Sequence, residues 1–191
     1  MHWLYRKTDT FSPEQLQTVY SQLSPDRKAY IDRLHRQEDR DRSVAAEALV
    51  YQLLEQLGVT GAQLHRRENG QPYLTGCRLH VSISHSAQVV ACAVSDKPVG
   101  IDIEQIRPIK PRLCRHVCTP EEMEYVWQGQ IPTDDTLCQD AAVLTRFFEI
   151  WTGKEAYFKK LGTGIADLKS VNILPLPRQQ QTLEDYIVQI M

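Results

Sequence analysis

The sequence lacks the long apolar segments that mark membrane-spanning and exported proteins. No stretch of the 191-residue chain approaches the ~18 apolar residues that a membrane helix needs. The first residues, Met1-His2-Trp3-Leu4-Tyr5-Arg6, have no apolar core of the kind found in a signal peptide. We therefore expect a cytoplasmic protein that has no membrane partner.

The sequence also lacks an excess of charge of either sign. It has 22 basic and 24 acidic residues, which gives a formal net charge of −2. A nucleic-acid partner is not expected, because neutralising phosphates requires a basic excess or a clear basic face. Hydrophobic residues make up 42% and charged residues 24% of the chain, as in an ordinary globular protein. The length predicts one domain, or two small halves that share a core.

Cysteine is scarce, and several common catalytic motifs are missing. The chain has five cysteines, an odd number, which favours reduced thiols over a disulfide framework. Cys114-x-His116-x-Cys118 could be a metal-binding fragment, but it has no second ligand pair at zinc-site spacing, so plain thiols are favoured. The motifs GxxxxGK[ST], GxGxxG, GxSxG and HExxH are also absent. Any phosphate chemistry would therefore depend on basic side chains and a metal ion.

Helix and strand signals come in mixed order along the chain and predict an α+β fold. Capping patterns open helices at Ser12-Pro13-Glu14-Gln15, Ser24-Pro25-Asp26 and Thr119-Pro120-Glu121-Glu122, and apolar periodicity predicts helices over about 41–57 and 141–161. Alternation or continuous apolar character predicts strands over 78–84, 89–94 and 99–104, the first two joined as a hairpin. The two prolines of 107–112 indicate a connection, and after residue 173 only 186–190 is predicted as a strand.

Two carboxylates share one face of the strand predicted over 99–104. Val99, Ile101 and Ile103 would face the core, so Asp102 and Glu104 would project together from the other face, about 7 Å apart. Two neighbouring carboxylates repel each other unless a cation lies between them, and hard oxygen ligands suit Mg²⁺ or Mn²⁺. The alternative is the solvated face of an edge strand.

A second candidate group lies on the long helix predicted over 141–161. Its apolar stripe of Leu144, Phe148 and Trp151 continues to Glu155 and then Lys159. A carboxylate on such a stripe faces inward, where it needs a partner, a metal ion or a shifted pKa. The alternative is a structural Glu155–Lys159 ion pair at i, i+4.

Two further segments could hold a ligand. Ser84 and His85, at the end of a predicted strand, offer hydrogen bonds to an anion, although a histidine there is more often structural. Asn69-Gly70-Gln71-Pro72 is predicted to be a turn, and its glycine would also permit a close approach of the backbone to a ligand.

Together these segments resemble the 4′-phosphopantetheinyl transferases, in particular the larger, monomeric, surfactin-synthetase-activating type. The family pattern is close to G-K-P, then S-H-S, then G-I-D-I-E, then W-x-x-K-E-A-x-x-K. The corresponding segments here are Gly70-Gln71-Pro72, Ser84-His85-Ser86, Gly100-Ile101-Asp102-Ile103-Glu104 and Trp151-Thr152-Gly153-Lys154-Glu155-Ala156-Tyr157-Phe158-Lys159. The last two motifs are specific at this interval, and the resemblance covers about residues 24–170.

The resemblance implies a fold and a reaction. The fold is two similar α+β halves related by a pseudo-twofold axis, with the active site in the cleft between them. Residues 1–98 would form the half that contacts coenzyme A, and residues 99–191 the half with the metal-binding carboxylates and the carrier-docking surface. The reaction, of the holo-[acyl-carrier-protein] synthase type, transfers phosphopantetheine from coenzyme A to a serine of an apo acyl or peptidyl carrier protein and releases 3′,5′-ADP.

The resemblance also implies roles for single residues. Asp102, Glu104 and Glu155 would hold Mg²⁺, with Mn²⁺ as a substitute. Glu155, Lys159 and Asp102 would form the catalytic group, with Glu155 as the base for the carrier serine, directly or through a metal-bound water. The residues expected to contact coenzyme A are Arg27, Arg42, Gly70, Gln71, Pro72, Ser84, His85, Lys154 and Lys159. Gln71 stands where the family usually has Lys or Arg, so that contact would weaken or come from Arg66 or Arg67.

The expected partner is acidic around its serine, so a basic docking surface should be present. Arg107, Lys110, Arg112 and Arg115 follow the predicted carboxylate strand and are our candidates, with a solvated loop as the alternative. Two other functions stay open: a non-catalytic module that binds coenzyme A or a carrier, and an unrelated metal-dependent phosphoesterase, which would call for a richer Asp/His ligand set. The chain is long enough for both halves, so we expect a monomer.

Overall fold

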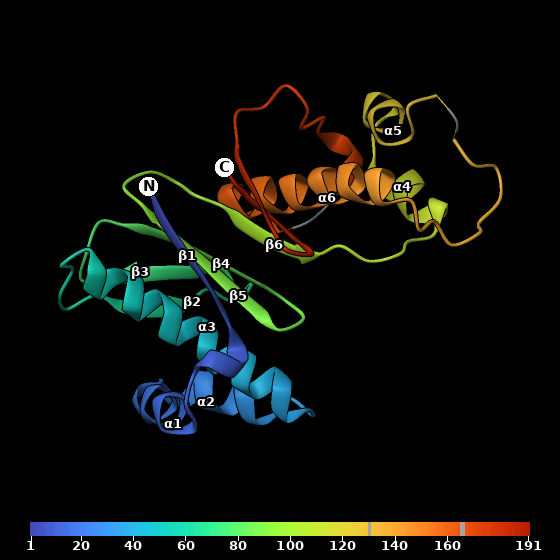
Figure 1. The fold of residues 1–191 in the computed structure, drawn as a ribbon. Helices are drawn as coiled ribbons and strands as arrows, with labels where there is room; N and C mark the ends of the chain where they lie inside the picture. Colours follow the sequence, from blue (N-terminus) through green and yellow to red (C-terminus); the bar gives the residue numbers. More distant parts are fainter. Residues whose placement is uncertain (130, 165–166) are drawn as a thin grey trace. The chain divides into compact units, whose positions relative to one another are not determined.

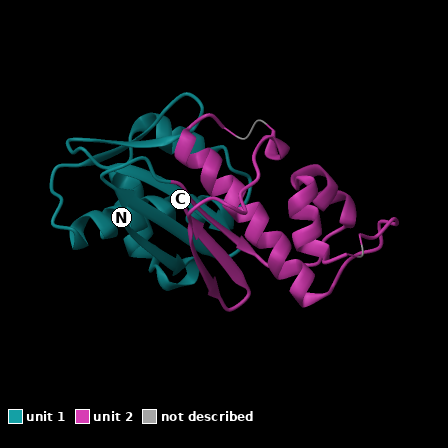
Figure 2. Ribbon diagram, turned by 90° about the horizontal axis from the view of Figure 1, so that it is seen from above, with its two compact units in different colours: residues 1–99 teal, residues 100–191 magenta. Residues whose placement is uncertain are grey.

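The computed structural model describes residues 1–129, 131–164 and 167–191 (Figure 1). The chain divides into two compact units, Met1–Val99 and Gly100–Met191, which Figure 2 colours separately. Both units combine helices with antiparallel strands, which confirms the α+β prediction. Among the described residues, no helix combines the length and the apolar character that crossing a membrane requires.

The first unit is built on a three-stranded antiparallel sheet with the order β1-β5-β4. These strands are β1 (His2–Lys7), β4 (His80–Ser86) and β5 (Val89–Ser95), and a separate hairpin pairs β2 (Gln63–Arg66) with β3 (Pro72–Thr75). The helices are α1 (Pro13–Gln22), α2 (Pro25–Asp32) and α3 (Gln37–Gln56), preceded by the 3₁₀ turn η1 (Thr8–Thr10). The predicted β4–β5 hairpin is confirmed, and the cap of α1 has both hydrogen bonds of the predicted capping box.

Helix α3 packs across this sheet and supplies one side of the first core (Figure 1). Its inward residues include Ala45, Leu49 and Leu53, which pack with Val90 and Cys92 of β5. Burial of such apolar surface is the main contribution that favours this arrangement.

The second unit has its own three-stranded antiparallel sheet, with the order β6-β8-β7. The strands are β6 (Ile101–Gln105), β7 (Gln179–Leu183) and β8 (Tyr186–Ile190), and the helices are α4 (Pro111–Val117), α5 (Pro120–Trp127), α6 (Ala141–Leu161) and the 3₁₀ turn η2 (Leu168–Ser170). Helix α6 packs on β6 and β8, with Phe147, Phe148 and Ile150 fully buried in the second core.

Two elements of the second unit differ from the sequence prediction. Helix α4 occupies part of a segment predicted to be a connection, because Pro111 lies in the first helical turn, where proline is tolerated. Strand β7 was not predicted, because its sequence Gln-Gln-Gln-Thr-Leu is polar and almost wholly exposed at the sheet edge. The sheet is therefore not reduced to two strands.

The cysteines behave as the sequence predicts. All five are free thiols, and Cys92, Cys114 and Cys118 are buried. Burial raises the pKa of Cys92 and of Cys114 to about 12, so both thiols stay protonated and unreactive at neutral pH.

Candidate active site

Strand β6 carries the first two candidate carboxylates, Asp102 and Glu104. Ile101 and Ile103 are fully buried on one face, as the alternation predicts. Asp102 on the other face is only 1% exposed, and Glu104 is half-buried. The alternative of a solvated strand face is therefore wrong for Asp102, and a buried carboxylate requires compensation by a cation.

Gly100 explains how β6 comes so close to α6. A Cβ atom added to Gly100 would lie 1.8 Å from the carbonyl oxygen of Ala156 and 2.6 Å from the backbone nitrogen of Lys160. Only a residue without a side chain permits this contact between the two backbones. The contact fixes the strand beside the turn of α6 that carries the second half of the site.

Helix α6 supplies Glu155 and Lys159, and Lys159 faces the strand. Its Nζ lies 2.6 Å from Oδ1 of Asp102, with Lys159 28% and Asp102 2% exposed in their side chains. The structure thus pairs Lys159 with the aspartate of the strand, where the sequence alternative was an ion pair with Glu155. This contact brings together residues 57 positions apart in the chain.

Glu155 is partly buried, and its electrostatics couple it to the same group. Burial and, to a smaller extent, repulsion from Asp102 and Glu104 raise the pKa of Glu155 to about 7, although the charge of Lys159 acts in the opposite direction. The three carboxylates are therefore close enough to influence one another, and Glu155 is poised to exchange a proton near neutral pH.

The donor set suits a hard divalent cation. Among residues 1–129, 131–164 and 167–191, no three His, Cys, Asp or Glu side chains form a preformed metal cage. Mg²⁺ seldom uses such a cage, because it keeps several waters and binds through one or two carboxylates together with substrate phosphates. Asp102, Glu104 and Glu155 offer only oxygen donors and repel one another, so a bound Mg²⁺ would relieve that repulsion.

Glu104 also has a cationic neighbour of its own. Arg107 donates to Oε2 of Glu104 at 3.1 Å, and its guanidinium lies 5.5 Å from the centre of the Phe148 ring. Arg107 was predicted as a docking residue, but this contact ties it to the carboxylate group. Such an exposed pair contributes little stability, so Arg107 is able to exchange partners.

Lys154, predicted to contact coenzyme A, has a different position and the prediction is corrected. Its side chain is fully buried, with Nζ 2.6 Å from Oε2 of Glu122. The same Nζ donates to the carbonyl oxygens of Val117, Leu168 and Val171 at 2.9, 2.5 and 2.8 Å. With its donors used internally and no exposed surface, Lys154 joins α6 to the neighbouring segments instead of binding a ligand.

The first unit holds the other predicted ligand contacts. Ser84 is buried on β4 and His85 beside it is exposed. Gly70 forms the predicted turn with a φ of 82°, and its amide donates to the carbonyl of Arg67 at 2.9 Å. Gln71 and Pro72 follow it into β3, half-buried.

The two predicted arginines of this unit differ in their partners. Arg42 on α3 pairs with Asp39 at 3.0 Å, with 21% of its side chain exposed. Arg27 on α2 donates through Nε to Glu47 at 2.8 Å and through a terminal nitrogen to Ser43 at 2.7 Å. Arg42 is therefore the more readily available of the two for a new ligand, while Arg27 belongs to an internal cluster.

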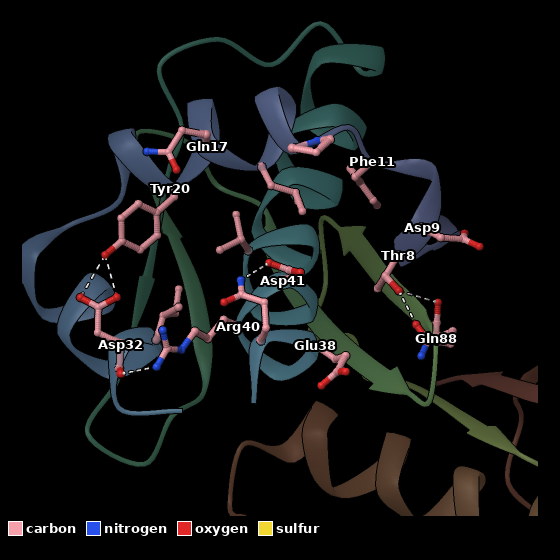
Figure 3. A pocket seen from close by; sticks show the side chains of 15 residues that line it. Thr8, Asp9, Phe11, Gln17, Tyr20, Asp32, Glu38, Arg40, Asp41 and Gln88 are labelled. Atoms are coloured by element: carbon pink, nitrogen blue, oxygen red, sulfur yellow. Dashed lines mark hydrogen bonds between the residues drawn. The ribbon is translucent and has the colours of Figure 1, made fainter. Parts of the chain in front are cut away.

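A separate hollow of about 590 Å³ lies in the first unit, among α1, α2, α3 and η1 (Figure 3). Figure 3 shows the Tyr20 hydroxyl pointing at Asp32, to which it donates at 2.8 Å. Asp9, Glu38 and Asp41 also line it. None of the predicted site residues lines this hollow, and its carboxylates disfavour an anionic ligand.

Sequence reasoning missed two buried glutamates. Glu122 and Glu47 are 0% and 2% exposed. Glu47 lies three residues before Val50 on the apolar stripe of α3, which is the same signal that identified Glu155. Sequence reasoning placed Glu122 only in a capping box, as its N3 residue; Glu122 fills that role and also pairs with Lys154.

Comparison with known proteins identifies the family. A family model described as the 4′-phosphopantetheinyl transferase superfamily matches residues 98–189. The chain is 32% identical over 181 residues to the 4′-phosphopantetheinyl transferase HetI of Nostoc, a match that covers 89% of this chain and 72% of that protein. The chain belongs to the 4′-phosphopantetheinyl transferase family.

Other members of this transferase family match a smaller share of their own length. The 4′-phosphopantetheinyl transferase gsp of Aneurinibacillus migulanus is 33% identical over 76% of this chain and 58% of that protein. The Sfp protein of Bacillus subtilis is 28% identical over 81% of this chain and 67% of its own length. The match thus covers 58% of the length of gsp and 67% of the length of Sfp.

Proposed function

We propose that this protein transfers the 4′-phosphopantetheine arm of coenzyme A to a serine hydroxyl of an apo carrier protein in a Mg²⁺-dependent reaction that releases 3′,5′-ADP. The observation that carries the proposal is the meeting of the two most specific motifs: Asp102 of β6 pairs with Lys159 of α6 beside Glu155. Membership of the transferase family supports the same reaction class.

The charges of the site fit attack on a pyrophosphate. Glu155 would accept the proton of the serine hydroxyl as its oxygen attacks the phosphorus that carries the pantetheine. The bond from that phosphorus to the bridging oxygen then breaks, and 3′,5′-ADP leaves with the electron pair. Lys159, partly exposed beside Asp102, would place a positive charge next to the phosphate oxygens. Mg²⁺ bound by Asp102, Glu104 and Glu155 would supply further neutralisation of the pyrophosphate.

The proposal divides the ligand contacts between the two units. The first unit would contribute Arg42, the turn of Gly70, Gln71 and Pro72, and the pair Ser84 and His85 to coenzyme A. The second would contribute the metal-binding carboxylates and Lys159. We further propose that two similar halves are related by a pseudo-twofold axis and that the protein is cytoplasmic. We also propose that it is a monomer. A mass from light scattering that corresponds to a dimer would contradict the monomeric state.

The carrier is proposed to dock on the basic segment that begins α4. Lys110 and Arg112 are exposed, and Arg112 and Arg115 share Asp135 at 3.3 and 3.7 Å. Charge reversal by Lys110→Glu with Arg112→Glu should raise KM for an acidic carrier about tenfold and leave KM for coenzyme A unchanged, because complementary charge steers the encounter. Equal changes in both KM values would contradict docking here. Arg107 is less suitable for this test because it contacts Glu104.

The test of the reaction is the intact mass of an apo carrier protein after incubation with this protein, coenzyme A and Mg²⁺. The expected result is a gain of one phosphopantetheine group that is lost with EDTA and with Glu155→Ala. No gain with any of several acyl and peptidyl carriers, despite tight binding of coenzyme A, would overturn transfer in favour of a non-catalytic binding module. Release of phosphate from coenzyme A without a carrier would instead favour a phosphoesterase.

A further inference from the structure

The hollow of the first unit has an apolar floor. Its volume of about 590 Å³ lies within the range of about 300–1,000 Å³ that small-molecule sites occupy. Phe11 at the end of η1, Ile31 of α2 and Val44 of α3 line it and are 7%, 1% and 5% exposed. A ligand with an apolar body would remove the remaining surface of this floor from water, which favours its binding.

Four carboxylates surround this floor. Asp9, Asp32, Glu38 and Asp41 line the hollow, and Arg40 is the one basic residue among the described lining residues. The lining side chains therefore carry a net charge of −3, compared with −2 for the whole chain. Figure 3 shows Asp32 and Asp9 on opposite sides of the hollow, with Asp41 between them. The negative charge is thus spread along the hollow and is not gathered at one point.

Two of these carboxylates have neutral partners. The hydroxyl of Tyr20 donates to both carboxylate oxygens of Asp32, at 2.8 and 3.0 Å. The amide of Gln37 donates to Oδ1 of Asp41 at 2.8 Å. These hydrogen bonds hold the carboxylates in place but bring no positive charge, so the attraction for a cation is retained.

The neighbouring cations are held by other groups. Arg40 donates to the backbone carbonyl oxygens of Leu34 and Asp32 at 2.8 and 3.2 Å. Arg6 and Lys28 lie over aromatic rings of the lining, 4.0 and 5.8 Å from the ring centres, and both donate to backbone carbonyls elsewhere. Within the part of the chain that the structure describes, none of these three cations forms an ion pair with a carboxylate of the hollow.

The spread of the carboxylates favours an extended ligand over a metal ion. Among residues 1–129, 131–164 and 167–191, no three His, Cys, Asp or Glu side chains are grouped closely enough to hold a metal ion. A phosphate that could complete a ligand set is disfavoured here by the negative charge. A linear polyamine fits the pattern, because methylene segments separate its ammonium groups. These segments would lie on the apolar floor, as the stem of a lysine lies on apolar surface.

We propose that this hollow is a binding site for a linear aliphatic polyamine. Its ammonium groups contact the four carboxylates, and its methylene segments cover the apolar floor. The site is separate from the proposed transfer reaction, since none of the residues to which we assign a part in that reaction lines the hollow.

The test is isothermal titration calorimetry on the full chain with spermidine, a triamine, and with 1,4-diaminobutane, a diamine. We expect about one spermidine bound per chain and about tenfold weaker binding of the diamine, because one charge-assisted contact is lost. Mg²⁺ at the same concentration as spermidine should not displace it, because the hollow does not group its carboxylates around one ion. Displacement by Mg²⁺ would show a general attraction to negative charge and would overturn the site.

Paired variants separate the hollow from the rest of the acidic surface. Glu38→Gln with Asp41→Asn removes two of the four carboxylates and should weaken spermidine binding about tenfold or more. Glu55→Gln with Asp26→Asn removes the same charge from exposed positions outside the hollow and should change the affinity less than about twofold. Should the first variant prove unstable in thermal melts, Asp9→Asn, on the exposed turn η1, should weaken binding about threefold.

The outcomes decide the proposal and leave the transfer reaction to its own test. Equal losses of spermidine affinity in the two double variants would overturn the site, because binding would then follow net charge alone. Absence of spermidine binding to the unaltered protein would overturn it as well. Selective loss in Glu38→Gln with Asp41→Asn, in a protein that modifies no carrier, would retain the polyamine site and overturn the transferase.

Discussion

Two lysines of the same motif on α6 have opposite surroundings. Lys154 is fully buried and pairs with Glu122, while Lys159 is 28% exposed in its side chain and pairs with Asp102. Both ion pairs have the same length, 2.6 Å. The difference is that Lys154 has three backbone carbonyls as further partners and Lys159 lies beside the carboxylates of the candidate active site. The position of a lysine in this motif therefore does not show whether the lysine is structural or belongs to the active site; its burial must also be known.

The buried pair connects several segments of the second unit. Glu122 accepts from the backbone nitrogens of Thr119 and Ile173 at 2.8 and 2.9 Å, and Lys154 donates to the carbonyls that end α4 and begin η2. All polar atoms of this network are thus satisfied by one another, which is the condition for a buried ion pair to be tolerated.

The largest expected effect on stability comes from removing the buried lysine. Lys154→Met leaves Glu122 charged and buried, and should lower the free energy of unfolding by about 3–5 kcal/mol in urea denaturation. Lys160→Met, on the exposed side of the same helix, is the control and should change it by less than about 0.5 kcal/mol. A loss in Lys154→Met no larger than in the control would contradict the structural role.

An intermediate effect is expected where β6 contacts α6. Gly100→Ala forces a Cβ against the backbone of Ala156 and should lower the free energy of unfolding by about 1–3 kcal/mol. The rate of carrier modification should also fall clearly, because the strand that carries Asp102 must shift. Gly153→Ala is the comparison: its Cβ meets the end of the Ile173 side chain at 2.4 Å, and alanine favours the helix, so the cost should be smaller. Equal losses of unfolding free energy in Gly100→Ala and Gly153→Ala would contradict the close backbone contact between Gly100 and Ala156.

The smaller of the two lysine effects on stability is expected at Lys159. Lys159→Met leaves the buried carboxylate of Asp102 without this cation, but Lys159 is 28% exposed, so water can reach the space it vacates and the free energy of unfolding should fall by less than in Lys154→Met. The initial rate of carrier modification should nevertheless fall about 100-fold, because the charge beside the phosphates is lost. A variant that loses stability but modifies the carrier at the normal rate would reverse the roles of Lys154 and Lys159.

The sequence signals that proved reliable are local ones. Ser12 and Thr119 begin helices through capping boxes, and both hydrogen bonds of each box are present. The inward position of Glu155 was predicted because it continues the stripe of Phe148 and Trp151. These predictions succeeded because a cap or a helical face depends on residues within one or two turns.

The predictions that failed depend on contacts distant in the chain. Lys154 lies on the same helix as Glu155, and only the approach of Val117 and Leu168 makes it a buried structural residue. Glu47 pairs with Arg66, which reaches it from a separate hairpin. Strand β7 is polar and forms only because β8 offers it an edge to pair with. No spacing rule within a single element contains this information.

The most direct test of the candidate centre is the binding of Mn²⁺, followed by the electron paramagnetic resonance signal of the free ion, in the presence of coenzyme A. Our account predicts about one Mn²⁺ bound per chain, weakened about tenfold or more in Asp102→Asn and in Glu155→Gln and unchanged in Lys160→Met. Binding that is equally strong in all four proteins would contradict the assignment of Asp102 and Glu155 to a metal-holding active site.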